Sequence, residues 1–168
     1  MVYNNLFIIV AIGKGNEIGR NNELLAHLPN DMKRFKELTL NTTVLMGDTT
    51  FHSLQVKPLP RRRNIVLTFD KSLQLPQCEL AYSMGEALDL VKGEEHVFVM
   101  GGASVYKQFL PLVSKLYLTK IDANFAGADA FFPEIDYSQW ELVEEMGNAS
   151  DGQHSFDYTY CTYRRITK

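Results

Sequence analysis

Short apolar runs alternate along this chain with stretches whose apolar residues recur at helical spacing. Continuous apolar runs of this length are typical of strands that are covered on both faces. They predict strands over residues 6–12, 43–47, 64–68, 79–83 and 96–102. The helical spacing predicts helices over residues 28–38, 48–54, 84–92 and 103–110. Strands that alternate with helices favour a mostly parallel sheet with helices on both faces.

The last third of the chain changes to a two-residue period. Residues 115–121 alternate, and Thr119 points to the same, mostly apolar side as Tyr117 and Ile121. Residues 140–143 and 158–166 also alternate, without a crossover helix between them, which predicts an antiparallel hairpin at the sheet edge. We therefore expect one α/β domain over residues 1–168, with a mostly parallel central sheet and an antiparallel C-terminal hairpin. Residues 13–25 are rich in Gly and Asn and predict a long functional loop.

The predicted helix over residues 28–38 carries one acid on its apolar stripe. Asp31 shares this stripe with Leu28, Met32, Phe35 and Leu38. A carboxylate among apolar side chains must find a partner or change its proton affinity, so Asp31 is a candidate anchor for a polar, nitrogen-rich ligand. The alternative is that Asp31 only supports the helix start, with Asn30 as the cap, and faces water.

Composition narrows the class of protein further. The chain has 168 residues, a net charge of −3 and 45% hydrophobic residues, as in ordinary globular proteins. The basic run 61–63 is too short to predict nucleic-acid binding, and the apolar run 6–12 is too short to span a membrane. Cys78 and Cys161 stand far apart, and neither they nor the histidines show metal-ligand spacing. We expect free thiols, no metal, and a monomer in the cytoplasm.

Two strand ends carry glycines directly before a helix. Gly47 precedes hydroxyl-bearing residues, and the Gly101–Gly102 pair precedes the helix over residues 103–110. Such junctions let a phosphate approach free backbone N–H groups, although strand–helix packing alone also explains them. The GxGxxG spacing of a Rossmann dinucleotide site is missing.

Several short motifs in order resemble dihydrofolate reductase over nearly the whole chain. They are Val10-Ala11, Ile18-Gly19, Leu28-Pro29-Asn30-Asp31-Met32 with Phe35, Met46-Gly47 with Thr50-Phe51, Leu59-Pro60 with Arg62 and Asn64, Met100-Gly101-Gly102 with Val105-Tyr106, Tyr117-Leu118-Thr119 with Ile121-Asp122, and Phe132-Pro133. The resemblance implies reduction of 7,8-dihydrofolate to tetrahydrofolate with NADPH, by hydride transfer to pterin C6 and protonation at N5.

The resemblance also implies roles for individual residues. Asp31 would bind the 2-amino group and N3 of the pterin, Thr119 would steady Asp31, and Arg62 would bind the carboxylate of the glutamate tail. The substrate would contact Val10, Ala11, Asp31, Met32, Phe35, Leu54, Leu59, Arg62, Met100 and Thr119. NADPH would contact Ala11, Ile18, Gly19, Gly47, Thr49, Thr50, Leu67, Thr68, Gly101, Gly102, Ala103, Ser104, Val105 and Tyr106. The Gly101–Gly102 peptide bond would be cis.

Two positions depart from the family pattern. Ala26 stands where relatives usually have a tryptophan, which predicts a looser pterin site and weaker binding of diaminopyrimidine inhibitors. Asp48 stands where they commonly have a basic residue toward the 2′-phosphate of NADPH, which predicts weaker cofactor binding. Two alternatives therefore stay open: a pterin- or nucleotide-binding paralogue with impaired turnover, and a reductase that prefers NADH. A related reductase of pyrimidine-type precursors fits the Asp31, Phe35 and Arg62 set less well.

Overall fold

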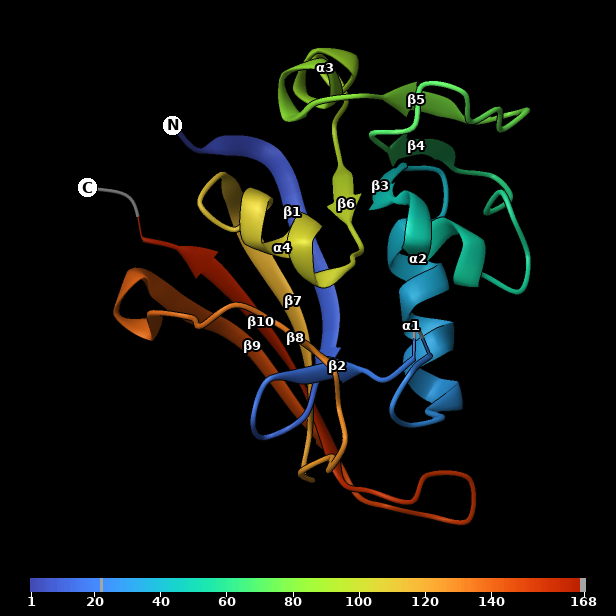
Figure 1. Cartoon of the computed structure of the whole chain (residues 1–168). Coiled ribbons are helices and arrows are strands. Elements are labelled where there is room, and N and C mark those ends of the chain that lie inside the picture. Colours follow the sequence, from blue (N-terminus) through green and yellow to red (C-terminus); the bar gives the residue numbers. More distant parts are fainter. Residues whose placement is uncertain (22, 167–168) are drawn as a thin grey trace.

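The computed structural model describes residues 1–21 and 23–166, and its centre is one eight-stranded sheet (Figure 1). The strand order is β5-β4-β3-β6-β1-β7-β10-β9. The strands are β1 (Tyr3–Ile12), β3 (Thr43–Gly47), β4 (Arg63–Leu67), β5 (Glu79–Ala81), β6 (Val97–Val99), β7 (Val113–Ile121), β9 (Trp140–Asn148) and β10 (Tyr158–Arg165). The helices are α1 (Pro29–Thr39), α2 (Asp48–Ser53), α3 (Met84–Leu90) and α4 (Ala103–Phe109), with a 3-10 turn at Tyr137–Gln139.

The direction of the strands confirms the predicted fold class. All neighbours from β5 to β7 pair in parallel, whereas β10 pairs antiparallel with both β7 and β9. The carboxyl ends of the parallel strands therefore meet at one edge of the sheet, which is where open α/β sheets usually bind ligands. Ile12, Gly47, Leu67, Val99 and Ile121 mark that edge.

Alternate residues of the central strands divide the core into two layers. From β1, Leu6 and Ile8 pack on one face with residues of α3 and α4, such as Phe109. Phe7 and Ile9 pack on the other face with residues of α1 and α2, such as Phe51. The helices thus cover both faces, as the period-two strand geometry requires (Figure 1).

The structure changes several predicted details. The loop over residues 13–25 contains a short strand, β2 (Glu17–Gly19), which pairs with a second short strand, β8 (Ala130–Phe131). Both were missed because strands of two or three residues leave no readable period. β9 continues to Asn148, well beyond residue 143, and the strand predicted over 79–83 ends at Ala81.

The predicted cap of α1 was wrong. Leu28 occupies the N-cap position and makes no side-chain hydrogen bond there, while Asn30 lies inside the first turn. The Asn30 side chain instead donates to the hydroxyl of Tyr158, at 3.1 Å. Pro29, which lacks an N–H and has a backbone suited to the first helical position, begins the helix.

No helix within residues 1–21 or 23–166 combines the length and the apolar character needed to cross a membrane. Cys78 is half-buried and Cys161 is buried, and both are free thiols, as the sequence predicted.

Candidate active site

Asp31 and Thr119 meet between α1 and the middle of the sheet. Thr119 lies on β7, opposite Ala11 on β1, and its side chain is only 3% exposed. The Thr119 hydroxyl donates a short hydrogen bond to Oδ1 of Asp31 across 88 residues of sequence. The apolar side of β7 therefore carries one hydroxyl at the point where the apolar stripe of α1 carries Asp31. The interpretation of Asp31 as a solvent-facing residue is wrong.

Burial dominates the electrostatics of Asp31. Loss of solvent raises the pKa of the carboxyl above its usual value of 3.8, against the opposing effects of the Thr119 hydrogen bond and the nearby Arg34 cation. The Arg34 guanidinium stacks over the ring of Tyr160, 4.2 Å from its centre. Burial, together with the charge of Asp31, also raises the pKa of Tyr160 to about 12. A carboxyl group in this setting can hold either a proton or a hydrogen-bonded cationic ring system.

Apolar side chains line the approach to this acid from the same face of the sheet. Phe35 of α1 shares one hydrophobic cluster with three more residues predicted to contact the substrate, namely Leu54, Leu59 and Met100. Met32 is 46% exposed, so its side chain is free to cover a ligand. Ala11 packs in a neighbouring cluster with Leu28. Val10 faces the opposite layer, so only its backbone can contribute on this side.

Arg62 is fixed by its own chain. Its Nε donates to the carbonyl of Pro60 and its Nη1 donates to the hydroxyl of Thr39, each at 3.0 Å. The Thr39 hydroxyl in turn donates to the carbonyl of Phe35, at 2.8 Å. Partial burial lowers the pKa of the Arg62 guanidinium, which nevertheless stays charged because arginine titrates far above neutrality. This network links a cation to the C-terminal end of α1, while Asp31 lies at its N-terminal end.

The two glycine junctions meet at the carboxyl edge of the sheet. The Gly47 N–H donates to the carbonyl of Gly101, at 2.9 Å, and the Gly101–Gly102 peptide bond is cis. Gly101 has a φ of 122°, which side-chain-bearing residues rarely adopt. A Cβ built on either Gly101 or Gly102 would lie 3.4 Å from the hydroxyl of Thr50. These glycines form a cradle, defined by Gly47, Gly101 and Gly102, in which the backbone bears no side chains of its own and the Thr50 hydroxyl lies close by.

Tyr106 supports this cradle from beneath. Its buried hydroxyl donates to the carbonyl of Ile9 at 2.8 Å, and burial holds the pKa of the phenol well above its usual range. The remaining residues predicted for the cofactor lie at the same edge or on β2. Leu67 and Val105 are buried, Ala103 is half-buried, Thr49 and Ser104 are exposed, and Ile18 and Gly19 belong to β2.

Asp48, which directly follows Gly47, forms a second aspartate–threonine pair at the carboxyl edge of the sheet. Oδ2 of Asp48 accepts a hydrogen bond from the hydroxyl of Thr68, at 2.6 Å, and Thr49 donates to Oδ1 at 3.4 Å. The Thr68 hydroxyl also accepts the N–H of Asp70, at 3.1 Å. Phe69, directly after Thr68, is 85% exposed. The acid predicted to disfavour a phosphate is thus fixed in place.

Ala26 lies in the cluster beside Asp31, as its position before α1 predicts. It is half-buried and packs with Leu28 and Ile121, and two aromatic residues, Phe125 and Phe156, belong to the same cluster. The two phenyl rings meet edge to face, with centres 5.4 Å apart. The methyl group of Ala26 fills only part of the volume that an indole would occupy.

Sequence reasoning missed Glu17, which ties two loops together beside the site. Its side chain is 5% exposed and accepts hydrogen bonds from the N–H groups of Gly15 and Phe125. Burial raises the pKa of this carboxyl, but the N–H donors lower it more, so the net shift is downward. An acid in a turn-rich stretch gives no sequence signal of this role.

Sequence reasoning also missed the contact between His154 and α1. The Asn30 N–H donates to Nε2 of His154 at 3.2 Å, although the two residues lie 124 positions apart. A lone histidine far along the chain carries no pattern from which this contact could be predicted.

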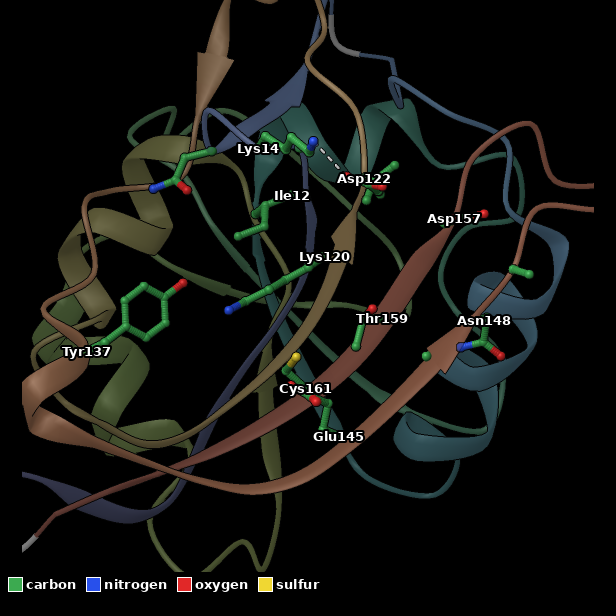
Figure 2. Close-up of a pocket in the computed structure, with 15 residues that line it drawn as sticks. Ile12, Lys14, Lys120, Asp122, Tyr137, Glu145, Asn148, Asp157, Thr159 and Cys161 are labelled. Atoms are coloured by element: carbon green, nitrogen blue, oxygen red, sulfur yellow. Dashed lines mark ion pairs between the residues drawn. The ribbon is translucent and has the colours of Figure 1, made fainter.

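A separate cavity of about 710 Å³ lies against β7, β9 and β10 (Figure 2). Lys120, Thr159 and Cys161 line it, and they alternate along β7 and β10 with Thr119, Tyr158 and Tyr160. Because neighbouring strand residues face opposite sides, this cavity lies across the sheet from Asp31. The Asp31–Thr119 pair therefore does not face this cavity.

Comparison with known proteins agrees with this geometry. A family model described as dihydrofolate reductase matches residues 5–165. Dihydrofolate reductase of Bacillus subtilis is 38% identical over 94% of this chain and 92% of the relative. That of Neisseria gonorrhoeae is 42% identical over 82% of this chain and 84% of the relative. The structure of dihydrofolate reductase from Enterococcus faecalis, complexed with NADP(H) and RAB-propyl, superimposes with a TM-score of 0.89 and 37% identity. That match covers 99% of this chain and 100% of the other.

Proposed function

The chain belongs to the dihydrofolate reductase family and reduces 7,8-dihydrofolate with NADPH, and we propose that Asp31, steadied by Thr119, anchors the pterin during this reaction. The observation that carries the proposal is the Asp31–Thr119 pair, in which the half-buried acid of α1 accepts a hydrogen bond from the buried hydroxyl of β7. A half-buried carboxylate beside apolar walls suits a ring that offers two adjacent N–H donors, and the 2-amino group and N3 of the pterin are such donors.

In the proposed mechanism Asp31 acts through the pterin ring. Its negative charge, bound to the 2-amino group and N3, raises the proton affinity of N5 on the same ring, and a water molecule delivers the proton there. Asp31 binds the far side of the ring and is therefore unsuited to direct donation. NADPH, when bound, supplies the hydride that goes to C6. The apolar wall that includes Phe35 excludes water from the ring and strengthens each of these electrostatic effects.

Arg62 is proposed to bind the α-carboxylate of the glutamate tail. Two hydrogen bonds, to the Pro60 carbonyl and the Thr39 hydroxyl, orient the guanidinium in advance. A planar guanidinium suits a carboxylate because it can donate two parallel N–H bonds. The spacing supports this role, since Arg62 is linked through Thr39 to the last turn of α1 and Asp31 lies in the first.

NADPH is proposed to lie along the carboxyl edge of the sheet. The glycine cradle around Gly101 supports this assignment, because glycines let a ligand approach the backbone closely and the φ of Gly101 is one that other residues rarely adopt. The Thr50 hydroxyl beside the cradle offers a hydrogen bond to a phosphate or ribose oxygen. Asp48, fixed by Thr68, supplies no attraction for the 2′-phosphate, so the affinity depends on the rest of the edge.

We also propose that the whole chain acts as one reductase domain, as a monomer in the cytoplasm. The free thiols Cys78 and Cys161 support a reducing compartment. A single sheet that draws strands from both halves of the chain supports one folding unit.

A steady-state assay tests the proposed function. Purified chain should oxidise NADPH only when dihydrofolate is present, and the Asp31→Asn variant should bind NADPH but turn over far more slowly. Chain that binds dihydrofolate and NADPH without oxidising the cofactor would contradict the proposal. The same assay with NADH decides whether the cofactor preference has shifted.

A further inference from the structure

The first turn of α1 is capped by a residue from the other end of the chain. Leu28 at the N-cap offers no side-chain acceptor, and Pro29 has no N–H, so the first helical N–H that needs a partner is that of Asn30. This N–H donates to Nε2 of His154, at 3.2 Å. His154 belongs to the loop between β9 and β10, drawn in red below the lower end of α1 in Figure 1.

His154 is the buried residue of a loop that is otherwise exposed, apart from the half-buried Phe156. Its side chain is 1% exposed, whereas its neighbours Gln153 and Ser155 are exposed. Its Nδ1 lies 2.8 Å from Oδ1 of Asp151, and the same oxygen accepts the backbone N–H of His154. This side-chain hydrogen bond is the main cause that lowers the pKa of Asp151.

These contacts define the tautomer of His154. The Asp151 carboxylate can only accept, so Nδ1 carries the hydrogen. Nε2 is then left with a lone pair, which matches the N–H that Asn30 presents. Both ring nitrogens are therefore engaged, one holding the loop and the other holding the helix.

Asn30 is held to the same part of the structure by its side chain. Its amide donates to the hydroxyl of Tyr158, at 3.1 Å, and the Tyr158 ring lies against that of His154, with centres 5.1 Å apart. Tyr158 begins β10 and lies opposite Ile121 of β7, two residues beyond Thr119. Residue 30 is thus bound to β10 and its loop, while the next residue, Asp31, is bound to β7.

We propose that His154 is a positioning residue for Asp31: its Nε2 fixes the first turn of α1, so that the Asp31 carboxylate meets the pterin at the correct distance. The inference rests on the proposed role of Asp31. A displacement of about 1 Å in a reacting group can cost on the order of 100-fold in rate, so a modest shift of this turn is measurable. The glycine cradle is built from β3 and β6, so NADPH binding should be independent of His154.

Two substitutions of nearly equal polarity separate the ring nitrogens of His154. The amide of His154→Gln reaches the position of Nε2 and can still accept the Asn30 N–H. The shorter amide of His154→Asn reaches only the position of Nδ1, so it keeps the Asp151 contact and loses the helix. We expect His154→Asn to raise the KM and the Kd for dihydrofolate by roughly tenfold. The KM for NADPH should be unchanged, and His154→Gln should stay within about twofold of the unsubstituted chain.

The Kd for dihydrofolate, measured by fluorescence titration, separates this inference from the proposed function. A wild-type chain without turnover contradicts the proposed function, while the Gln–Asn difference in Kd still decides the role of His154. Equal Kd values for dihydrofolate in the two variants would overturn the positioning role. So would a loss of dihydrofolate affinity that is the same in both variants, parallels their loss of thermal stability and is accompanied by a higher KM for NADPH.

Asp151→Ala is the second variant, in case His154→Asn does not fold. It changes an exposed residue and leaves the ring free to turn, so a two- to threefold rise in KM for dihydrofolate is expected. An unchanged KM there would count against the proposal.

Discussion

Two aspartate–threonine pairs lie at opposite ends of the proposed site, and their surroundings differ. Thr119 donates to Asp31 between a helix and the centre of the sheet, where burial raises the pKa of the acid. Thr68 donates to Asp48 at the start of α2, where the acid is equally half-buried but stands beside the exposed Phe69. The same pair of groups can therefore bind a cationic ring in one place and repel a phosphate in the other. The surrounding side chains and the expected ligand, rather than the residue types, decide the outcome.

The two aspartates are also held in place by different kinds of contact. Asp31 is fixed through its neighbour Asn30, whose N–H and side chain contact His154 and Tyr158. Asp48 is held by residues much nearer in sequence, because Thr49 and Thr68 contact its two oxygens and Thr68 lies only 20 positions away. The additional contacts of Asn30 suit a group whose position must be exact to a fraction of an ångström.

Removing the negative charge of Asp31 or of Asp48 should show most clearly that the two pairs differ in function. We expect Asp31→Asn to lower kcat/KM for dihydrofolate by about 100-fold or more, because the pterin loses its anionic partner. The matched variant Asp48→Asn should leave kcat for dihydrofolate at saturating NADPH within about twofold. Steady-state kinetics of both variants measures this, and similar losses in the two would show that the ends do not differ in function.

Reversing the charge at Asp48 tests whether this residue weakens the binding of NADPH. Asp48→Arg should tighten NADPH binding by about tenfold, or 1.4 kcal/mol, because an attraction replaces a repulsion. The gain should fall as salt is added, since partly exposed charges are screened. Titration with NADPH and NADH checks this, with NADH as the control that lacks the 2′-phosphate. A gain of equal size for NADH would contradict the charge argument.

Enlarging Ala26 tests how well the pterin end is packed. Ala26→Trp should improve inhibition by diaminopyrimidines by roughly threefold to fivefold, since an indole fills volume beside the cluster of Leu28 and Phe125. Inhibition constants for the two proteins measure the effect, and Ala26→Leu is a control for size without the indole N–H. Equal constants for Ala26 and Trp would show that the neighbouring phenyl rings already close this space.

The smallest expected effect is on stability. The pKa of Asp31 is raised in the folded state, so folding favours its protonated form, and the wild-type chain loses stability as pH rises from 3.8 through the folded pKa. Asp31→Asn lacks this loss, so its Tm at pH 7 should be higher by on the order of 2–4 °C. For a chain of this size, that difference corresponds to about 1 kcal/mol in the free energy of unfolding. Below about pH 3.8 the difference should vanish. A variant that is less stable at neutral pH would contradict the sign.

The sequence alone determined the fold class and most of the proposed site. Apolar runs and periods predicted the parallel sheet, the helices on both faces and the antiparallel end, because these patterns reflect which face of each element is buried. The motifs resembling dihydrofolate reductase predicted the Asp31–Thr119 pair and the cis bond at Gly101, and the structure contains both. The departures at Ala26 and Asp48 are also readable from sequence, since each is a change of residue type at a motif position.

Only the tertiary structure decided which distant residues support those positions. His154 caps α1 from 124 residues away, Glu17 joins two loops, and Thr68 occupies an oxygen of Asp48. Each is a hydrogen bond between side chain and backbone, or between two side chains, that chain folding brings within 3.2 Å or less. Such contacts leave no period or spacing in the sequence, because they depend on where loops return to the sheet. The amino-acid pattern thus determines the site, and the folded chain determines how firmly the site is held.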